Sequence, residues 1–490
     1  MSAQRMALLA AQHRSLAAQR SSLAALIAVS ASLGCVSSSI DHDVRRVRAL
    51  TRIEQLPDVV DRDVDPRADE AARRLLAEPL AADSAVRVAL LDNRELRASL
   101  RELGIDRGRL LQASLLPNPH VEAELLPERD TQVELRVEYD ITRALLTPAR
   151  ADAAAPALEA ARYRAAAAVV DLGVRVRRAF YGLQAALQRL ALAQRTLDAW
   201  AAARDAAQAM HAAGNLNQLE RAGHEAAYQK QRVAVALLEL EVASAREQLQ
   251  RLLGVHGAAA NWRVRGELTA VPADPPSLAR IETRALRASL ELKERGQRVE
   301  SLARRAGFTR AQGWIPEVLL DVHALHGNAD DEAPGADDEW RWGAGVSVEI
   351  PLFDRDQGTA AALRAELEAE LERYYGLAAE IRSSAREAAG RLESAHARAR
   401  QYQAVIVPAQ GEVTEQTLLQ YNAMQLGIFA LLQARREQLD VELAYVDTLR
   451  EYWSASAELD ALLAGRRAMP VPFGAGAAPG FGTTESTGGH

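Results

Sequence analysis

A very long stretch of the chain, from Pro148 to Ala213, has the spacing of a single helix. Its apolar residues recur in alternating steps of three and four, at Val169, Leu172, Val176, Ala179, Leu183, Ala186, Leu190, Ala193 and Leu197. This 3.5-residue period makes helices supercoil around a partner. The stretch predicts a coiled-coil helix roughly 100 Å long, far longer than a helix of a globular protein.

The same period continues beyond a turn at Gly214 and Asn215, in a helix predicted from Gln218 to Leu253. Its seam consists of Val235, Leu238, Val242, Ala245, Leu249 and Leu252. Arg, Gln, Glu and Asp fill most outward positions, which indicates that this helical hairpin lies in water.

The order of segments repeats along the chain. A helix from about Asp83 to Leu116, two short alternating segments and the hairpin make a first repeat, 83–254. After a proline-containing linker, 255–277, a helix to Gln312, two alternating segments, a helix from Gln357 to Met424 and a helix to Leu463 make a second, 278–466. The order predicts an internal duplication.

Local matches support the duplication. The five residues Leu96–Leu100 recur identically as Leu286–Leu290, and Pro148 and Pro351 each precede a long helix. Gly214 and Gly427 are interpreted as the corresponding turns of the two hairpins.

Four segments alternate apolar and polar residues with the two-residue period of a strand. They lie near 120–125, 132–141, 318–325 and 340–350. The polar set is unusually charged: Glu122, Glu124, Glu134, Arg136, Glu138, Asp140, Asp321 and Glu349. Gly343 and Gly345 fall in the same set as small residues. An ordinary half-buried sheet shows the same alternation, but the charges favour strands with one face toward lipid and these residues toward a lumen.

The lengths and flanks of these segments fit a membrane. About 9 to 11 residues of tilted strand cross a bilayer, and Trp314, Trp340 and Trp342 sit where its interfaces fall. Four strands cannot close on themselves, and open edges are not tolerated in lipid. Since roughly twelve strands are needed for an aqueous bore, the sequence predicts a homotrimer with a twelve-stranded barrel.

The N-terminal residues predict export. Arg5, Arg14 and Arg20 precede a short apolar run, 23–33, typical of a signal peptide. The run ends at Cys35, the single cysteine of the chain, in a sequence that resembles a bacterial lipobox, with leucine two residues before the cysteine instead of three. Residues 1–35 are therefore interpreted as a signal peptide ending in a lipidation site, the alternative being a plain signal peptide. Residues 36–82 are expected to be a polar tether or equatorial segment and 467–490 a disordered tail.

Composition and motifs exclude several functions. The net charge of -7, with both signs interspersed, leaves no basic stripe for nucleic acid. His224-Glu225 begins like a zinc-protease motif without its second histidine, so we interpret it as a solvated helix face. Asp41-His42-Asp43 is interpreted as part of the flexible tether. No catalytic residue, cofactor site or metal site is predicted, and the chain is expected not to be an enzyme.

The chain resembles the TolC-like outer-membrane efflux family from roughly Leu80 to Gly465. The resemblance rests on Asp83–Leu90 with Asn93–Leu96, Leu116–Pro119, Ala213–Leu216, Ile350–Arg355, and Pro408 followed by Tyr421, Gly427 and Leu431–Ala434. The residues that follow the last strand, Ile350–Gly358, are similar to those of the heavy-metal branch of this family. The family places glycine three residues after the tyrosine, whereas here Gly427 is six residues after Tyr421.

The resemblance implies a mainly helical fold with a small β part, in which a trimer forms a periplasmic α-barrel continuous with the membrane strands. It also implies an outer-membrane channel that passively conducts substrates, heavy-metal cations among them. A periplasmic adaptor and an inner-membrane pump of the resistance-nodulation-division type would dock at the helical tips, Gly214, Asn215, Tyr421 and Gly427. Turn chemistry alone explains these tip residues equally well.

Three alternatives remain at this point. A drug-efflux or type I secretion duct would share the fold. A secreted coiled-coil scaffold explains the heptads but not the strands. A periplasmic adaptor has one helical hairpin and no membrane strands.

Overall fold

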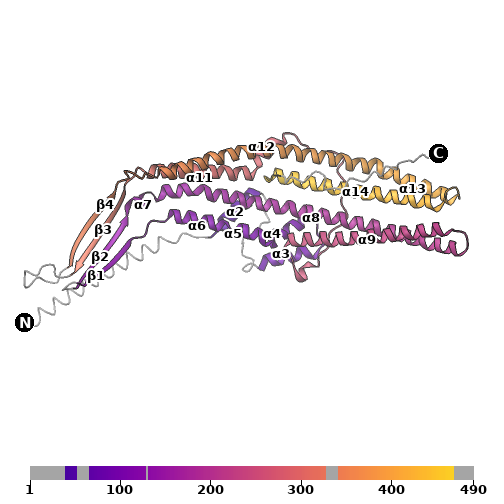
Figure 1. The fold of residues 1–490 in the computed structure, drawn as a ribbon, viewed down its shortest axis with the longest axis horizontal. Helices are drawn as coiled ribbons and strands as arrows, with labels where there is room; N and C mark the ends of the chain where they lie inside the picture. The colour runs from indigo at the N-terminus through magenta and orange to yellow at the C-terminus, as the bar shows by residue number, and fades with distance from the viewer. Residues whose placement is uncertain (1–38, 52–65, 128–130, 327–339, 468–490) are drawn as a thin grey trace, which may run out of the picture. The chain divides into compact units, whose positions relative to one another are not determined.

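The computed structural model describes residues 39–51, 66–127, 131–326 and 340–467 (Figure 1). The predicted signal peptide with Cys35 and the predicted tail from 468 onward lie outside the described residues. The chain divides into two compact units, and each draws on both predicted repeats. A sheet unit contains 104–158 and 307–357, and a helical unit contains 43–103, 159–306 and the chain from 358 onward.

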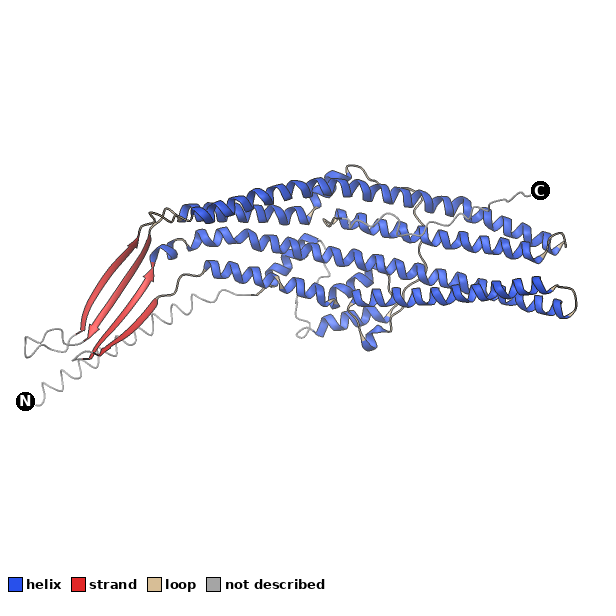
Figure 2. Ribbon diagram, viewed as in Figure 1, coloured by secondary structure: helices blue, strands red, loops and turns tan. Residues whose placement is uncertain are grey.

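The four predicted strands are present in the sheet unit as one antiparallel sheet (red in Figure 2), in the order β1-β2-β3-β4 labelled in Figure 1. They are β1 (His120–Pro127), β2 (Thr131–Asp140), β3 (Glu317–His326) and β4 (Trp340–Glu349). Each agrees with its alternating segment to within a few residues. Pairing of β2 with β3 joins the strand pairs of the two repeats and leaves β1 and β4 as the edges.

A short helix, α7 (Ile141–Leu145), follows β2 and fixes the turn out of the sheet. Asp140 caps it by accepting a hydrogen bond from the Arg143 backbone N–H at 2.7 Å. The Thr142 hydroxyl donates to the Pro316 carbonyl and accepts from the Val318 N–H, each at 2.9 Å. These bonds tie the end of β2 to the start of β3.

The first hairpin matches its prediction closely. Helix α8 (Thr147–Ala212) has 66 residues and α9 (Gln218–Leu253) has 36. The predicted seam is buried or half-buried along both helices, with Val169, Val176 and Leu249 fully inside. Small alanines in the seam let the backbones approach closely.

The second hairpin is interrupted where the sequence predicted one continuous helix. Its first arm consists of α12 (Gln357–Gln401), a π-helical segment (Tyr402–Ile406) and α13 (Val407–Asn422). Pro408 has no N–H for the carbonyl of Ala404 and its ring crowds that carbonyl, which is a known cause of local helix widening. The return helix α14 (Ile428–Leu463) ends as predicted.

The helices ahead of the strands are also more broken than predicted. Residues 83–116 form α4 (Ala82–Asp92), α5 (Arg94–Arg101) and α6 (Leu103–Ser114), and 278–312 form α10 (Ile281–Ala288) and α11 (Leu290–Gln312). Asn93 and Ser289 stand at equivalent breaks, because each side chain accepts a bond from the backbone N–H three residues on. The identical residues Leu96–Leu100 and Leu286–Leu290 are therefore not equivalent, since only the second set contains a break.

The predicted tether is partly helical, which corrects the sequence interpretation. Helices α2 (Asp41–Thr51) and α3 (Pro66–Ala77) lie within it. Asp43 is fully buried, and its Oδ1 accepts from Arg162 Nε at 2.9 Å and Nη2 at 2.6 Å. This carboxylate anchors α2 on α8.

The linker packs along helices of both repeats in the helical unit and contains one short 3₁₀ helix, η1 (Gly257–Ala260). The Gln184 side chain donates to the Arg265 carbonyl at 2.8 Å, and the Trp453 indole donates to the Thr269 carbonyl at 2.8 Å. Trp262 is buried under the Arg246 guanidinium. Among the described residues, no helix is both long enough and apolar enough to cross a bilayer.

Candidate functional site

One face of the sheet collects the charged residues that the alternation singled out. The register aligns them in rows across the strands: Glu124, Glu134, Leu325 and Arg341; Glu122, Arg136, His323 and Gly343; His120, Glu138, Asp321 and Gly345; Asp140, Leu319 and Ser347. Glu349, opposite Glu317, completes the set. All eight predicted lumen residues thus share a single face, here called the polar face.

The opposite face is apolar, and none of the described segments forms a layer over it. Trp342 is 76% exposed, Val121 65% and Val346 65%. A half-buried sheet of a soluble protein would cover this face with a second layer. The exposed apolar face is a surface that requires lipid or another protein against it.

The three tryptophans lie near opposite ends of this sheet. Trp314 precedes β3, whereas Trp340 and Trp342 begin β4 and pair with the far end of β3. All three are exposed, and the Arg355 guanidinium lies 4.4 Å from the Trp314 ring centroid. Their separation by the length of the strand fits the two interfaces of a membrane.

The glycines Gly343 and Gly345 have a more specific role than small size alone. A Cβ on Gly343 would lie 2.3 Å from His323 Nε2, and one on Gly345 would lie 2.3 Å from Asp321 Oδ1. The side chains of His323 and Asp321 therefore lie over the two glycines. The sequence pattern places His323 on the polar side of its strand, but His323 was not predicted as a site residue, although an Asp-x-His spacing on a strand puts both side chains on one face.

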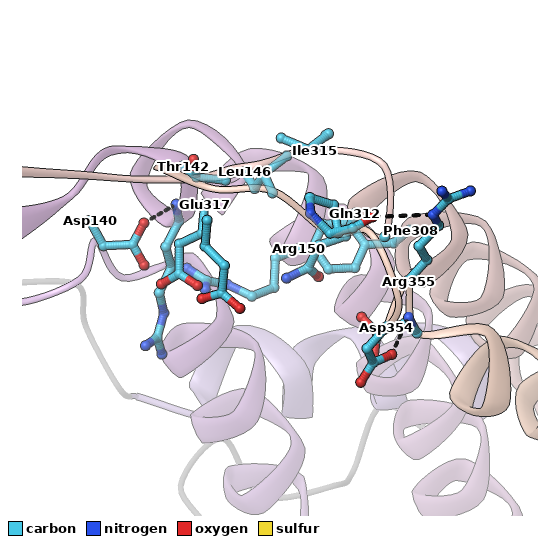
Figure 3. A pocket seen from close by; sticks show the side chains of 15 residues that line it. Asp140, Thr142, Leu146, Arg150, Phe308, Gln312, Ile315, Glu317, Asp354 and Arg355 are labelled. Atoms are coloured by element: carbon cyan, nitrogen blue, oxygen red, sulfur yellow. Dashed lines mark hydrogen bonds between the residues drawn. The ribbon is translucent and has the colours of Figure 1, made fainter. Parts of the chain in front are cut away.

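A recess of about 500 Å³ lies where the strands of the sheet unit meet the adjoining helices (Figure 3). Its charged lining comprises the carboxylates of Asp140, Glu317, Glu349, Asp354 and Asp356 and the guanidiniums of Arg143, Arg150 and Arg355. Arg150 donates to the carbonyls of Ala113 and Leu115, each at 3.2 Å. Asp140, Glu317 and Glu349 continue the polar face into this recess.

The tip turns of the two hairpins have the same backbone and different residues. At the first tip, Gly214 has φ 77° and its N–H donates to the His211 carbonyl at 3.0 Å. At the second, Met424 has φ 60° and its N–H donates to the Tyr421 carbonyl at 2.9 Å. Met424 is thus the counterpart of Gly214, and the pairing of Gly214 with Gly427 is wrong.

Gly427 instead precedes α14 as its N-cap residue, the place that Asn217 occupies before α9. Asn217 accepts a bond from the Glu220 N–H at 2.8 Å, whereas Gly427 has no side chain to do so. A glycine three residues after Tyr421, as the resemblance to the TolC-like family implies, would fall at position 424, where the left-handed conformation favours glycine.

Each tip also exposes large apolar side chains. Met424 is 95% exposed and Leu219 82%. Sequence reasoning missed both, because the heptad pattern does not show which apolar residues lack a partner.

The interpretation of His224 as part of a solvated face is wrong. His224 is only 2% exposed, and its ring stacks on Phe429 of α14 with a centroid distance of 4.6 Å. Burial lowers its pKa from the usual 6.5, against the opposing charge of Glu220. The residue joins the tips of the two hairpins. Among the described residues, no three His, Cys, Asp or Glu side chains are grouped to hold a metal ion.

Residues 127–255 match the family described as "Outer membrane efflux protein". The cobalt-zinc-cadmium resistance protein CzcC of Cupriavidus metallidurans is 24% identical over 409 residues, covering 80% of this chain and 91% of that protein. Neither this relative nor the family is described as an enzyme.

Solved structures share the fold. A membrane protein from Pseudomonas aeruginosa superposes with a TM-score of 0.67 at 20% identity, covering 82% of this chain and 93% of that one. CusC, described as forming a transmembrane channel, superposes with a TM-score of 0.64 at 16% identity, covering 78% and 92%. The predicted TolC-like fold is confirmed: a mainly helical chain with a small antiparallel sheet, as in the outer-membrane efflux channels.

Proposed function

We propose that three copies of this chain form an outer-membrane channel of a tripartite efflux system, which passively conducts substrates delivered by an inner-membrane pump through a periplasmic adaptor. The observation that carries the proposal is the sheet. One face is charged, the other is apolar and exposed, and no described segment of the protomer pairs with the outer edge of β1 or of β4. Copies that share edges would satisfy the backbone groups of β1 and β4 and present the apolar face to lipid.

An exposed apolar stripe on a helix is a second observation in favour of a neighbouring copy. Val233, Leu237 and Leu240 follow helical spacing on α9 and are all more than half exposed, outside the seam with α8. An apolar stripe on a helix in water is stabilised by packing against another helix. A neighbouring copy supplies one in the proposed trimer, in which the predicted repeats 83–254 and 278–466 each contribute one hairpin.

The tips are the proposed docking place for the adaptor. Gly214, Asn215, Tyr421 and Gly427 stand at the two turns, beside the exposed side chains of Leu219 and Met424. The proposed membrane anchor is the sheet, with Trp314, Trp340 and Trp342 at the interfaces and a lipid on Cys35.

Heavy-metal cations are the proposed cargo. The relative CzcC is named for resistance to cobalt, zinc and cadmium. The polar face adds a physical reason, because seven of its eight predicted lumen residues are carboxylates, which attract cations.

Fractionation and electrical recording test the channel. The full chain should extract from outer membranes only with detergent, run as a trimer, and give steady conductance in a planar bilayer. A monomer that is soluble without detergent would contradict the proposal, and would favour a coiled-coil scaffold.

A deletion strain tests the cargo. Loss of the gene should sensitise the cell to cobalt, zinc or cadmium more than to drugs. Sensitivity to drugs alone would keep the channel and reject the metal assignment.

A further inference from the structure

His323 and Asp321 form an ordered pair on the polar face of β3. The imidazole Nδ1 lies 3.0 Å from Asp321 Oδ2, and the side chains are 38% and 26% exposed. With the carboxylate ionised, Nδ1–H donates to it. The Nε2 lone pair of the neutral ring is then available to another partner.

Strand β4 leaves room for the two atoms of the pair that could bind a metal ion, His323 Nε2 and Asp321 Oδ1. Nε2 of His323 lies over Gly343 and Oδ1 of Asp321 lies over Gly345, each 2.3 Å from the position of a Cβ. Any other residue at either glycine would force the donor to move. Glycine weakens a strand, so two in alternation at these places indicate that the space above them matters.

The surrounding charges favour a cation. Glu138 stands directly opposite Asp321 in the register, and Glu122 lies in the same row as His323. Like charges directly opposite each other destabilise a sheet, and a bound cation would relieve that cost. Arg136 stands directly opposite His323, between it and Glu122, and its charge is offset by the Glu134 carboxylate, which accepts its hydrogen bond at 2.8 Å.

The donor chemistry selects the class of cation. Imidazole suits Zn²⁺, Co²⁺ and Cu²⁺, whereas Mg²⁺ and Ca²⁺ prefer oxygen ligands. A carboxylate that accepts the other ring N–H orients a metal-binding histidine and strengthens it as a ligand. One imidazole with water completing the shell binds weakly, in keeping with the absence of a three-residue metal group among the described residues. A binding site inside a channel must be weak, because the cation has to leave the site for conduction to continue.

We propose that His323, oriented by Asp321 above Gly343 and Gly345, is a transient binding site for imidazole-preferring divalent cations, such as Zn²⁺ and Co²⁺, as they pass along the polar face. The inference rests on the proposed function, since the polar face must line water. It adds the residue that contacts the cation and the ligand chemistry that selects it.

Block of ionic current by Zn²⁺ tests the site. The purified full chain, inserted in a planar bilayer carrying potassium current, should be blocked reversibly by millimolar Zn²⁺ but not by the same concentration of Mg²⁺. His323→Ala should raise the half-blocking concentration of Zn²⁺ by about 10-fold or more. Asp321→Asn should raise it by about 10-fold, the usual effect of losing an orienting partner.

Two further variants separate binding from general damage. His326→Ala is the matched control, because His326 is in the same strand but on the apolar face, where its ring meets Trp340 at a centroid distance of 4.7 Å. It should leave the block unchanged. Gly343→Val keeps the histidine but fills the space of Nε2, and should weaken the block as His323→Ala does.

Equal Zn²⁺ block in the wild type and His323→Ala, or equal block by Mg²⁺, would overturn the inference. If His323→Ala does not insert, His323→Asn carries the same expectation. A wild-type protein that conducts but ignores Zn²⁺ would reject this site and keep the channel. A wild-type trimer that does not conduct at all would reject the proposed function itself.

Discussion

The two helical hairpins have the same plan and differ in how regular they are. In the first, α8 and α9 are each continuous, and the turn places glycine at its left-handed position. In the second, a π-helical segment interrupts the long arm, and methionine occupies the left-handed position. The same backbone turn is therefore made once from a residue suited to it and once from a residue that it strains.

This difference locates strain in the second hairpin. A π segment beside proline and a non-glycine residue at positive φ are both features that concentrate at functional sites. Gln403 Oε1 and Gln410 Nε2, in and after the π segment, are also buried without a hydrogen-bond partner in the described protomer. We therefore expect the helices of the second hairpin to open locally more easily than those of the first.

The largest expected effect concerns a feature that both hairpins share, the glycine that follows each return helix. Each ends at a left-handed glycine whose added Cβ would lie 2.6 Å from a backbone oxygen, Gly254 against Asp92 and Gly465 against Ala288. Gly254→Ala and Gly465→Ala should each cost about 3 kcal/mol, from strain and from the clash. Thermal unfolding of the detergent-solubilised protein measures this.

The control is a glycine inside a helix with open space around it. Gly223 in α9 meets no atom within 4 Å of an added Cβ, so Gly223→Ala should stabilise the protein by about 1 kcal/mol. A similar loss at Gly223 would contradict strain and clash as the cause, and unequal losses at positions 254 and 465 would contradict their equivalence.

A swap at the tips sharpens the comparison. Gly214→Met should destabilise the first tip by about 1 to 2 kcal/mol, and Met424→Gly should relieve strain of about that size at the second, less the entropy cost of glycine. Hydrogen exchange of the amides near each turn reports both changes. Faster exchange near position 424 in Met424→Gly would show that the methionine is not strained.

The proline beside the π segment gives a smaller effect. Pro408→Ala restores an N–H that can reach the Ala404 carbonyl, so exchange in residues 402–412 should slow by about 5-fold, equal to roughly 1 kcal/mol. Gly411→Ala in the same helix, with open space around it, is the control for helix propensity alone. Equal slowing in both variants would remove the special role of the proline.

Acid should loosen the contact between the tips slightly. Because burial lowers the pKa of His224 from 6.5, the folded protein takes up its proton less readily than the unfolded chain. The folded state therefore keeps its full stability above the unfolded-state pKa of 6.5 and loses part of it as the pH falls below 6.5 towards the lower pKa of the folded state. Hydrogen exchange near His224, corrected for intrinsic rates, should be faster at about pH 5.5 than at about pH 7.5.

His224→Phe removes the titrating group and keeps a ring against Phe429. Its tip should show no such dependence on pH. A dependence that persists in this variant would place the sensitive group elsewhere.

Periodicity predicted the elements well because it reflects which face is covered. The strands follow from a period of 2 and the first hairpin from a period of 3.5, the second hairpin follows from the repeated order of segments, and Gly254 marks a real helix end. The breaks at Asn93 and Ser289 could not be read in this way, because apolar spacing continues across them.

The tips and the site depend on three-dimensional neighbours. Nothing in the local sequence shows that His224 meets Phe429 from a helix two hundred residues away, or that Gly343 makes room for His323. The false match of Leu96–Leu100 with Leu286–Leu290 shows the reverse case, in which identical residues occupy different places.

Thiol labelling in intact outer membranes tests the central claim most directly, because Val121 and Glu122 are adjacent on β1 and face opposite ways. In a Cys35→Ser background, Glu122→Cys should react with a water-soluble, membrane-impermeant maleimide, while Val121→Cys should react only after detergent is added. Equal labelling of the two cysteines without detergent would contradict a sheet with one face in water and the other in lipid.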